Sequence, residues 1–206
     1  MIGYAVDAFI LLFVVIDPIG LAPIFMALTR NEKARTRRTL ALRAAGLALV
    51  ILVVFAVAGE RLLLTLGIGM PAFQIAGGAL LFLLAVDMVF ARPSGIRVTT
   101  EREQREARHR KDIAVFPLAF PLIAGPGAMT TVLLMAGESS ADALSILITV
   151  LVVVLLIVLT TGSLLLAPKL VRILGETGTN VFSRLFGVVL AALAVQYILD
   201  GIQSGL

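Results

Sequence analysis

The chain consists of long apolar runs separated by short segments that carry most of its charge. Three of these runs contain no charged residue over a length that can cross a membrane: residues 62–86, 113–137 and 143–168. A transmembrane helix needs about 20 mostly apolar residues. Breaks at charges and turn signals predict an all-α membrane protein with six transmembrane helices. We expect them at residues 4–29, 42–59, 70–91, 113–136, 143–167 and 181–202.

The composition supports this prediction. Of the 206 residues, 60% are hydrophobic and 15% are charged, whereas an average soluble domain is about 45–50% apolar and about 25% charged. A soluble fold of this size leaves too much surface in water to hide so many apolar side chains. Six helices use most of the chain, so we expect one integral membrane domain over residues 1–206 and a functional site among the helices.

Few residues are suited to catalysis or metal binding. The chain has no cysteine, and its single histidine, His109, lies in a charged segment. Thiolate sites, disulfides and histidine metal clusters are therefore excluded. Hydrolysis would need a histidine partner, a metal or paired acids. We expect no enzymatic activity, no metal and no cofactor.

The basic residues predict an orientation. Sixteen of the 17 Lys and Arg residues fall in or beside the segments that join the first and second, third and fourth, or fifth and sixth expected helices, and only Arg61 falls on the other side. Lys and Arg are retained on the cytoplasmic side of a membrane. We therefore expect these three segments, including a charged connector at 92–112, to be cytoplasmic and both termini to lie outside the cytoplasm. This placement explains the basic pI without a nucleic-acid partner.

The two halves of the chain resemble each other. The stretch FQIAGGALLFLLAVDM from Phe73 matches FSRLFGVVLAALAVQY from Phe182 at several positions, and Asp17-Pro18 falls on Gly125-Pro126 at a similar offset. Three helices per copy is an odd number, so the second copy must insert upside down relative to the first. We expect two inverted three-helix repeats, at about 1–91 and 113–206, which is a recurrent design of transporters.

Prolines concentrate in the first and fourth expected helices. Proline removes a backbone donor and clashes with the preceding turn of a helix, so we expect both helices to be broken near the membrane midplane. Asp17 before Pro18 is typical of an N-cap followed by the first helical residue. Gly125 before Pro126 predicts a second half-helix that begins at Gly125. The expected helix-breaking residues also include Pro23 and Pro121.

The two expected breaks differ in charge. The helix end at Gly125 is bare, and a helix N-terminus attracts anions, so it could receive a carboxylate. Asp17 could meet an ammonium group or carry a proton, because acids within membrane helices are functional candidates by default. The alternative is that Asp17 only caps its own half-helix. The candidate substrate-binding residues are Asp17, Pro18, Gly20, Gly125, Pro126, Gly127 and Thr130.

Other small and polar residues favour structural roles. Hydroxyls in membrane helices often bond their own backbone, and this is the alternative for Thr130. Gly77, Gly78 and Gly187 are expected to allow close helix packing.

Four motifs carry a resemblance to a known family. DPIGLAPIF from Asp17, FQIAGG from Phe73, FPLAFPLIAGPGAMTT from Phe116 and SRLFGVVLAALAVQYILDGI from Ser183 resemble the MarC family of bacterial and archaeal inner-membrane proteins. The resemblance implies six spans, a plasma-membrane location and a distant relationship to amino-acid exporters. Some members are described as neutral amino acid transporters. The chain departs from the family at Leu21, where asparagine is usual, and at Gln74, where arginine is common.

Together these features predict a secondary transporter or exporter of small neutral amino acids, with a proton or a sodium ion as the coupling ion. The expected partners are membrane lipids, the amino acid and the coupling ion. The alternative is a membrane protein that does not transport and acts as a scaffold or membrane-assembly factor.

Overall fold

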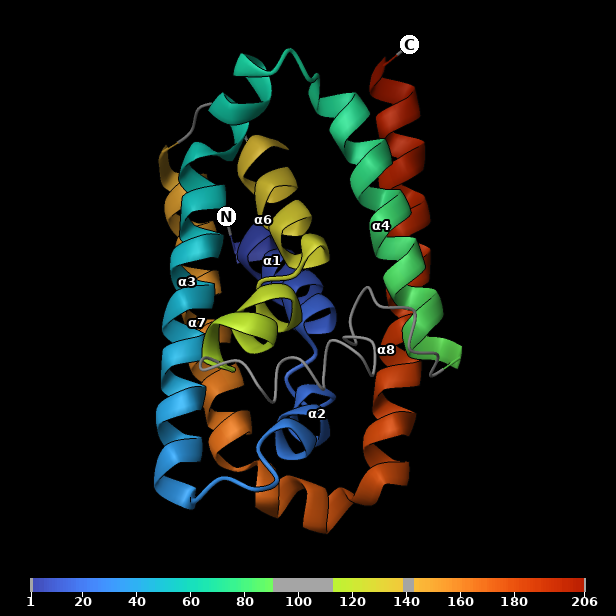
Figure 1. Ribbon diagram of the computed structural model, residues 1–206. Coiled ribbons are helices and arrows are strands. Elements are labelled where there is room, and N and C mark those ends of the chain that lie inside the picture. The colour runs from blue at the N-terminus through green and yellow to red at the C-terminus, as the bar shows by residue number, and fades with distance from the viewer. Residues whose placement is uncertain (1, 91–112, 139–142, 206) are drawn as a thin grey trace.

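The computed structural model describes residues 2–90, 113–138 and 143–205, and within these ranges all regular secondary structure is helical. The chain order is shown in Figure 1. The helices are α1 (Ile2–Ile16), α2 (Leu21–Leu28), α3 (Ala34–Thr65), α4 (Met70–Phe90), the π-helix η1 (Ala114–Ile123), α6 (Pro126–Glu138), α7 (Ala143–Leu165) and α8 (Ala167–Gly205).

The predicted all-helical membrane protein is confirmed at this level. Five segments of the described chain are long and apolar enough to cross a membrane, and η1 with α6 makes a sixth if the bent pair counts as one span. Several helices are longer than we expected, because the expected bounds covered only their apolar part. Thus α3 covers Ala34–Thr65 rather than 42–59, because its polar ends also consist largely of good helix formers.

The helices pack in antiparallel pairs around a central group. In Figure 1, α3 lies against α7 and α4 lies against α8, while α1, α2, η1 and α6 lie between these pairs. On α3 the buried stripe is mostly alanine, for example Ala41, Ala44, Ala48 and Ala56. This spacing of three to four residues places them on one face, and their small side chains let the central helices approach closely.

The outer surface is apolar. Val54 on α3, Val158 on α7 and Val188 on α8 are each more than half exposed. In water such a continuous apolar surface would cause aggregation, but it suits contact with lipid chains.

Glycines permit the close contact between α4 and α8. A Cβ on Gly78 would lie 2.7 Å from the carbonyl oxygen of Ala194, and a Cβ on Gly187 would lie 3.1 Å from that of Ala85. Both glycines therefore lie where a side chain would push the backbones apart, as expected for close packing. Gly77 faces the side chain of Thr130 on α6 instead.

The connections between the helices lie at two opposite ends of the bundle. The segment joining α2 to α3 and the turn joining α7 to α8 lie at one end, and the α3–α4 turn and the C-terminus lie at the other (Figure 1). The expected charged connector at 92–112 lies outside the described residues.

Candidate functional site

The first part of the candidate site is the junction between α1 and α2. Helix α1 ends at Ile16 and α2 begins at Leu21. Asp17 has a φ of +48°, which is the left-handed region that aspartate tolerates better than most residues. The N–H of Asp17 still makes the helical hydrogen bond to the carbonyl of Phe13 at 2.9 Å, and the positive φ then turns the chain out of α1.

Regular helix resumes later than the sequence predicted. We expected Pro18 to begin the new helix, but α2 begins at Leu21. The cause is a change of partners: the N–H of Ala22 donates to Ile19 at 3.2 Å, and the carbonyl of Pro18 accepts a hydrogen bond from Ser163 Oγ on α7. A side chain from another helix thus satisfies a carbonyl that the interruption frees, which a buried backbone requires.

The Asp17 side chain is fully buried at 0% exposure and binds in two directions. Its Oδ1 accepts a 3.0 Å hydrogen bond from the N–H of Gly20. Its Oδ2 accepts a 2.8 Å hydrogen bond from Ser183 Oγ on α8. The first contact closes the turn that precedes α2, whose N-cap residue is Gly20 rather than Asp17. The second joins the junction to α8, so a local and a tertiary contact occur together.

Gly20 makes room for this carboxyl group. A Cβ at Gly20 would lie 2.1 Å from Asp17 Oδ2 and 2.4 Å from Ser183 Oγ. No side chain fits in that space. Gly20 is therefore needed for the position of the Asp17–Ser183 contact.

The second part of the candidate site is the junction between η1 and α6. The segments Ala114–Ile123 and Pro126–Gly137 meet at a bend of 53°. Phe116 and Phe120 have extended backbone angles inside η1, since each precedes a proline, whose ring disfavours the helical conformation of the residue before it. Helix α6 begins at Pro126, one residue after the expected start, and its first turn is closed by the Met129 N–H, which donates to the Gly125 carbonyl at 3.0 Å.

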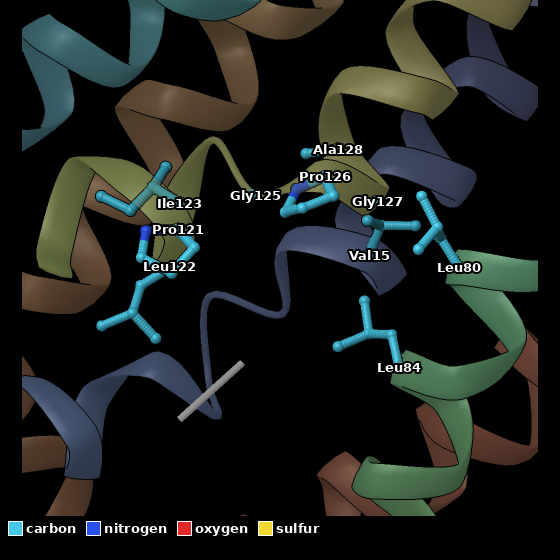
Figure 2. A pocket seen from close by; sticks show the side chains of 10 residues that line it. All are labelled: Val15, Leu80, Leu84, Pro121, Leu122, Ile123, Gly125, Pro126, Gly127 and Ala128. Carbon is cyan, nitrogen blue, oxygen red and sulfur yellow. The ribbon is translucent and has the colours of Figure 1, made fainter. Parts of the chain in front are cut away.

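A small pocket lies at this second junction. Figure 2 shows Val15 beside Pro126 and Gly127, with Leu80 and Leu84 of α4 nearby. The remaining lining residues come from η1, α6 and the junction between them: Pro121, Leu122, Ile123, Gly125 and Ala128. The pocket volume is about 20 Å³, which is room for about one water molecule.

The two junctions lie close together through Val15 and Gly127. A Cβ on Gly127 would lie 3.3 Å from Val15 Cγ1, and Val15 precedes Asp17 by two residues. However, Asp17, Pro18 and Gly20 do not line the pocket. In this conformation the Asp17 carboxyl group faces Ser183 rather than the start of α6.

The other expected site residues have structural neighbours. Thr130 is 4% exposed and packs against Gly77, where a Cβ would lie 2.0 Å from Thr130 Cγ2. Pro23 lies in the first turn of α2, and the helix continues through it, because a first-turn proline lacks only an N–H that has no partner within the helix. The interruption in this segment precedes Pro23. Pro121 lies in the irregular part of η1.

The sequence reasoning missed Ser163 and Ser183. Both hydroxyls reach the α1–α2 junction from distant helices. One signal was available for Ser183: in the internal repeat it occupies the position of Gln74, a residue already noted as a departure from the family. Within the part of the chain that the structure describes, no group of three His, Cys, Asp or Glu side chains could hold a metal ion.

Comparisons with known proteins agree with the motifs. Residues 2–206 match the model of the MarC family integral membrane proteins. A UPF0056 membrane protein of Methanocaldococcus jannaschii is 36% identical, over 98% of each chain. The UPF0056 inner membrane protein YhgN of Escherichia coli K12 is 32% identical, over 96% of this chain and 95% of its own. No solved structure matches the chain. The chain therefore belongs to the MarC family of integral membrane proteins.

Proposed function

We propose that the chain is a secondary transporter of small neutral amino acids in the plasma membrane. The observation that carries this proposal is the fully buried Asp17 carboxyl group at a backbone interruption within the membrane-length segment Gly3–Leu28. Discontinuous helices that present backbone groups and an acid within the membrane are the sequence and structural pattern of transporter sites. A buried intramembrane acid is costly and therefore a functional candidate.

The two junctions would take different parts of the substrate. The start of α6 at Gly125, Pro126 and Gly127 offers the positive end of a helix to the amino acid's carboxylate. Asp17 binds the ammonium group or carries the coupling ion, which is a proton or a sodium ion. The packing of Val15 on Gly127 keeps these two elements adjacent, as a small zwitterion requires.

The internal repeat supports a transporter architecture. In the internal repeat, Gly78 corresponds to Gly187 and Ala85 corresponds to Ala194. The contact of Gly78 with Ala194 is therefore the repeat counterpart of the contact of Gly187 with Ala85. The corresponding helices α3 and α7, and α4 and α8, also pack on each other. We propose two inverted three-helix repeats with broken first and fourth spans, in which one half rocks against the other.

The proposed orientation places the α2–α3 segment in the cytoplasm and both termini outside. It is supported by the basic residues Arg30, Lys33 and Arg35, all exposed at that end of the bundle, since positive charge is retained in the cytoplasm. The chain has no native cysteine, so single cysteines can report the topology. A membrane-impermeant maleimide applied to whole cells should label Leu66→Cys and spare Asn31→Cys. The reverse pattern would overturn the orientation.

One observation favours the alternative function, a scaffold or membrane-assembly factor that does not transport. The pocket at the second junction holds only about 20 Å³, which is room for about one water molecule. A transporter must therefore open this region in another conformation, whereas a scaffold has no such need.

The deciding experiment measures uptake and counterflow in proteoliposomes that contain the purified protein. Labelled glycine, alanine, serine and leucine are tested with imposed proton or sodium gradients. We expect transport by the wild type and its loss in Asp17→Asn. Asp7→Asn is the matched control, since Asp7 is an exposed acid on α1 and should retain transport.

The outcomes separate the two functions. Equal transport by Asp17→Asn and Asp7→Asn would remove Asp17 from the mechanism. No movement of any amino acid by protein that still unfolds cooperatively would assign the scaffold function instead. A dependence on only one of the two gradients identifies the coupling ion.

A further inference from the structure

A second and much larger cavity lies at the end of the bundle near the α2–α3 segment. Its volume is about 380 Å³, and it lies between the start of α3 and the C-terminal end of α7. Its walls are formed by Ala34, Arg37, Arg38, Leu164, Leu165 and Pro168. This cavity shares no lining residue with the pocket at the η1–α6 junction.

The side of the cavity formed by α3 is positively charged. Arg37 donates two long hydrogen bonds, of 3.3 Å each, to the carbonyls of Thr29 and Glu32. These acceptors are neutral, so they position the guanidinium group without neutralising it. Arg37 Nε is buried and has no hydrogen-bond partner within the described part of the chain. A buried donor without a partner is rare in folded proteins and needs an explanation, of which a bound ion is one.

Arg38 adds a second guanidinium group that lines the same cavity and is exposed. The backbone also adds positive charge to the cavity, because the wall includes Ala34, the first residue of α3. The N-cap residue Lys33 makes no side-chain capping hydrogen bond, and the N-terminal end of a helix is positive. Guanidinium groups form paired hydrogen bonds with phosphate oxygens, so two arginines beside a helix start favour the binding of a phosphate group.

The opposite wall is apolar. Leu164, Leu165 and Pro168 form it, and Leu165 is 41% exposed. Helix α3 has 32 residues and is therefore about 48 Å long, compared with about 30 Å for the hydrocarbon core of a bilayer. Its first turns thus reach the headgroup layer, where a ligand with a charged part and an apolar part is at hand.

We propose that this cavity binds the phosphodiester headgroup of an anionic phospholipid. Arg37 and Arg38 contact the phosphate, and the exposed side chains of Leu165 and Pro168 contact the first part of the acyl chains. Basic pockets between transmembrane helices are suited to such headgroups. The site is independent of the proposed transport function. Its lining residue Leu164 follows Ser163, whose hydroxyl donates to the Pro18 carbonyl at the α1–α2 junction.

Native mass spectrometry of the purified full chain tests the proposal. The protein is mixed with phosphatidylglycerol or with phosphatidylcholine of the same acyl chains, and retained lipids are counted. We expect one phosphatidylglycerol to be retained in preference to phosphatidylcholine. Arg38→Gln should weaken this retention by about tenfold, equivalent to about 1.4 kcal/mol. Ala34→Phe should do the same by filling the cavity while every charge is kept.

Arg35→Gln is the matched control. Arg35 is exposed on the same turn of α3 and does not line the cavity, so its loss should leave retention unchanged. Arg38→Gln is preferred to a change at Arg37, because Arg37 also holds the connecting segment. Thermal unfolding of each variant in detergent without lipid confirms that the fold is intact.

Three results would overturn the proposal. The first is equal retention of phosphatidylcholine and phosphatidylglycerol. The second is an equal loss of retention in Arg35→Gln and Arg38→Gln, which would indicate general surface charge. The third is protection against thermal unfolding by inorganic phosphate alone that equals the protection by phosphatidylglycerol, which would indicate a site for free anions rather than lipid.

Discussion

Ser183 Oγ donates a 2.8 Å hydrogen bond to Asp17 Oδ2, and the two residues are 166 positions apart in the chain. This contact joins the interruption between α1 and α2 to α8, on the C-terminal side of the kink at Gly175. It lies beside an aromatic contact between Phe13 and Phe186, whose ring centroids are 5.8 Å apart. The polar contact and the ring contact together fix the junction against α8.

Ser183→Ala should destabilise the protein by about 1–3 kcal/mol, because a buried carboxyl oxygen loses its donor. The measurement is thermal or chemical unfolding in detergent. Asn180→Ala, an exposed change one turn earlier on α8, serves as the control and should have little effect. Equal stabilities of the two variants would show that the contact with Asp17 contributes nothing.

Gly20→Ala should be more damaging than Ser183→Ala. The added methyl group would lie 2.1 Å from Asp17 Oδ2 and 2.4 Å from Ser183 Oγ, so the carboxyl group must leave its position. We expect a lower melting temperature and, if Asp17 takes part in transport, a loss of activity. The control is Gly46→Ala on α3, where nothing lies within 4 Å and helix propensity predicts a gain of up to about 1 kcal/mol.

Replacement of either repeat-related glycine on α4 or α8 should destabilise the helix pair to a similar degree. Gly78→Leu and Gly187→Leu each force a large side chain between closely packed backbones, near the carbonyls of Ala194 and Ala85. Gly162→Leu is the control, because its surroundings are open. Unfolding curves of the three variants test the expectation. A marked loss in only one of the paired variants would argue against equivalent roles in the two halves.

Thr160→Val should stabilise the protein, in contrast to most polar-to-apolar changes. Thr160 is 0% exposed, and its hydroxyl has no hydrogen-bond partner within the described residues. An unsatisfied buried hydroxyl costs about 1–3 kcal/mol, which valine removes at nearly constant shape. The matched change Thr149→Val should destabilise, since that hydroxyl bonds Ser145 at 2.9 Å and Tyr4 at 2.7 Å.

A combined assay makes the Thr160 prediction informative about function. If Thr160→Val unfolds at a higher temperature and also loses transport, the hydroxyl contacts the substrate or ion. If it unfolds at a lower temperature, a partner for the hydroxyl exists and the prediction is wrong.

The sequence predicted the helices well because the membrane imposes a simple rule. An apolar run such as 143–167 can only be a helix when it crosses lipid, and α7 covers Ala143–Leu165. The expected start of one further helix was also close to the observed one, because proline and glycine act through local backbone sterics. Helix α6 thus begins at Pro126, next to the expected Gly125.

The sequence could not predict how the freed backbone groups are satisfied. We expected α2 to begin at Pro18, but it begins at Leu21, because Ser163 on a distant helix donates a hydrogen bond to the Pro18 carbonyl. The carboxyl group of Asp17 likewise faces Ser183. Such partners depend on which helix faces overlap after folding, and a local pattern of residues carries no information about that overlap.

The kink in α8 at Gly175, with its φ of +66° and ψ of 175°, has a consequence for how the protein sits in its bilayer. The stretch before the kink runs across the end of the bundle (Figure 1) and carries Lys169 and Arg172, both exposed. A helical stretch with cationic side chains that runs parallel to the membrane surface is suited to the headgroup layer. Movement of the bundle deeper into the bilayer from this end would carry these charges into hydrocarbon, so the stretch opposes deeper insertion of the segment that holds Asp17.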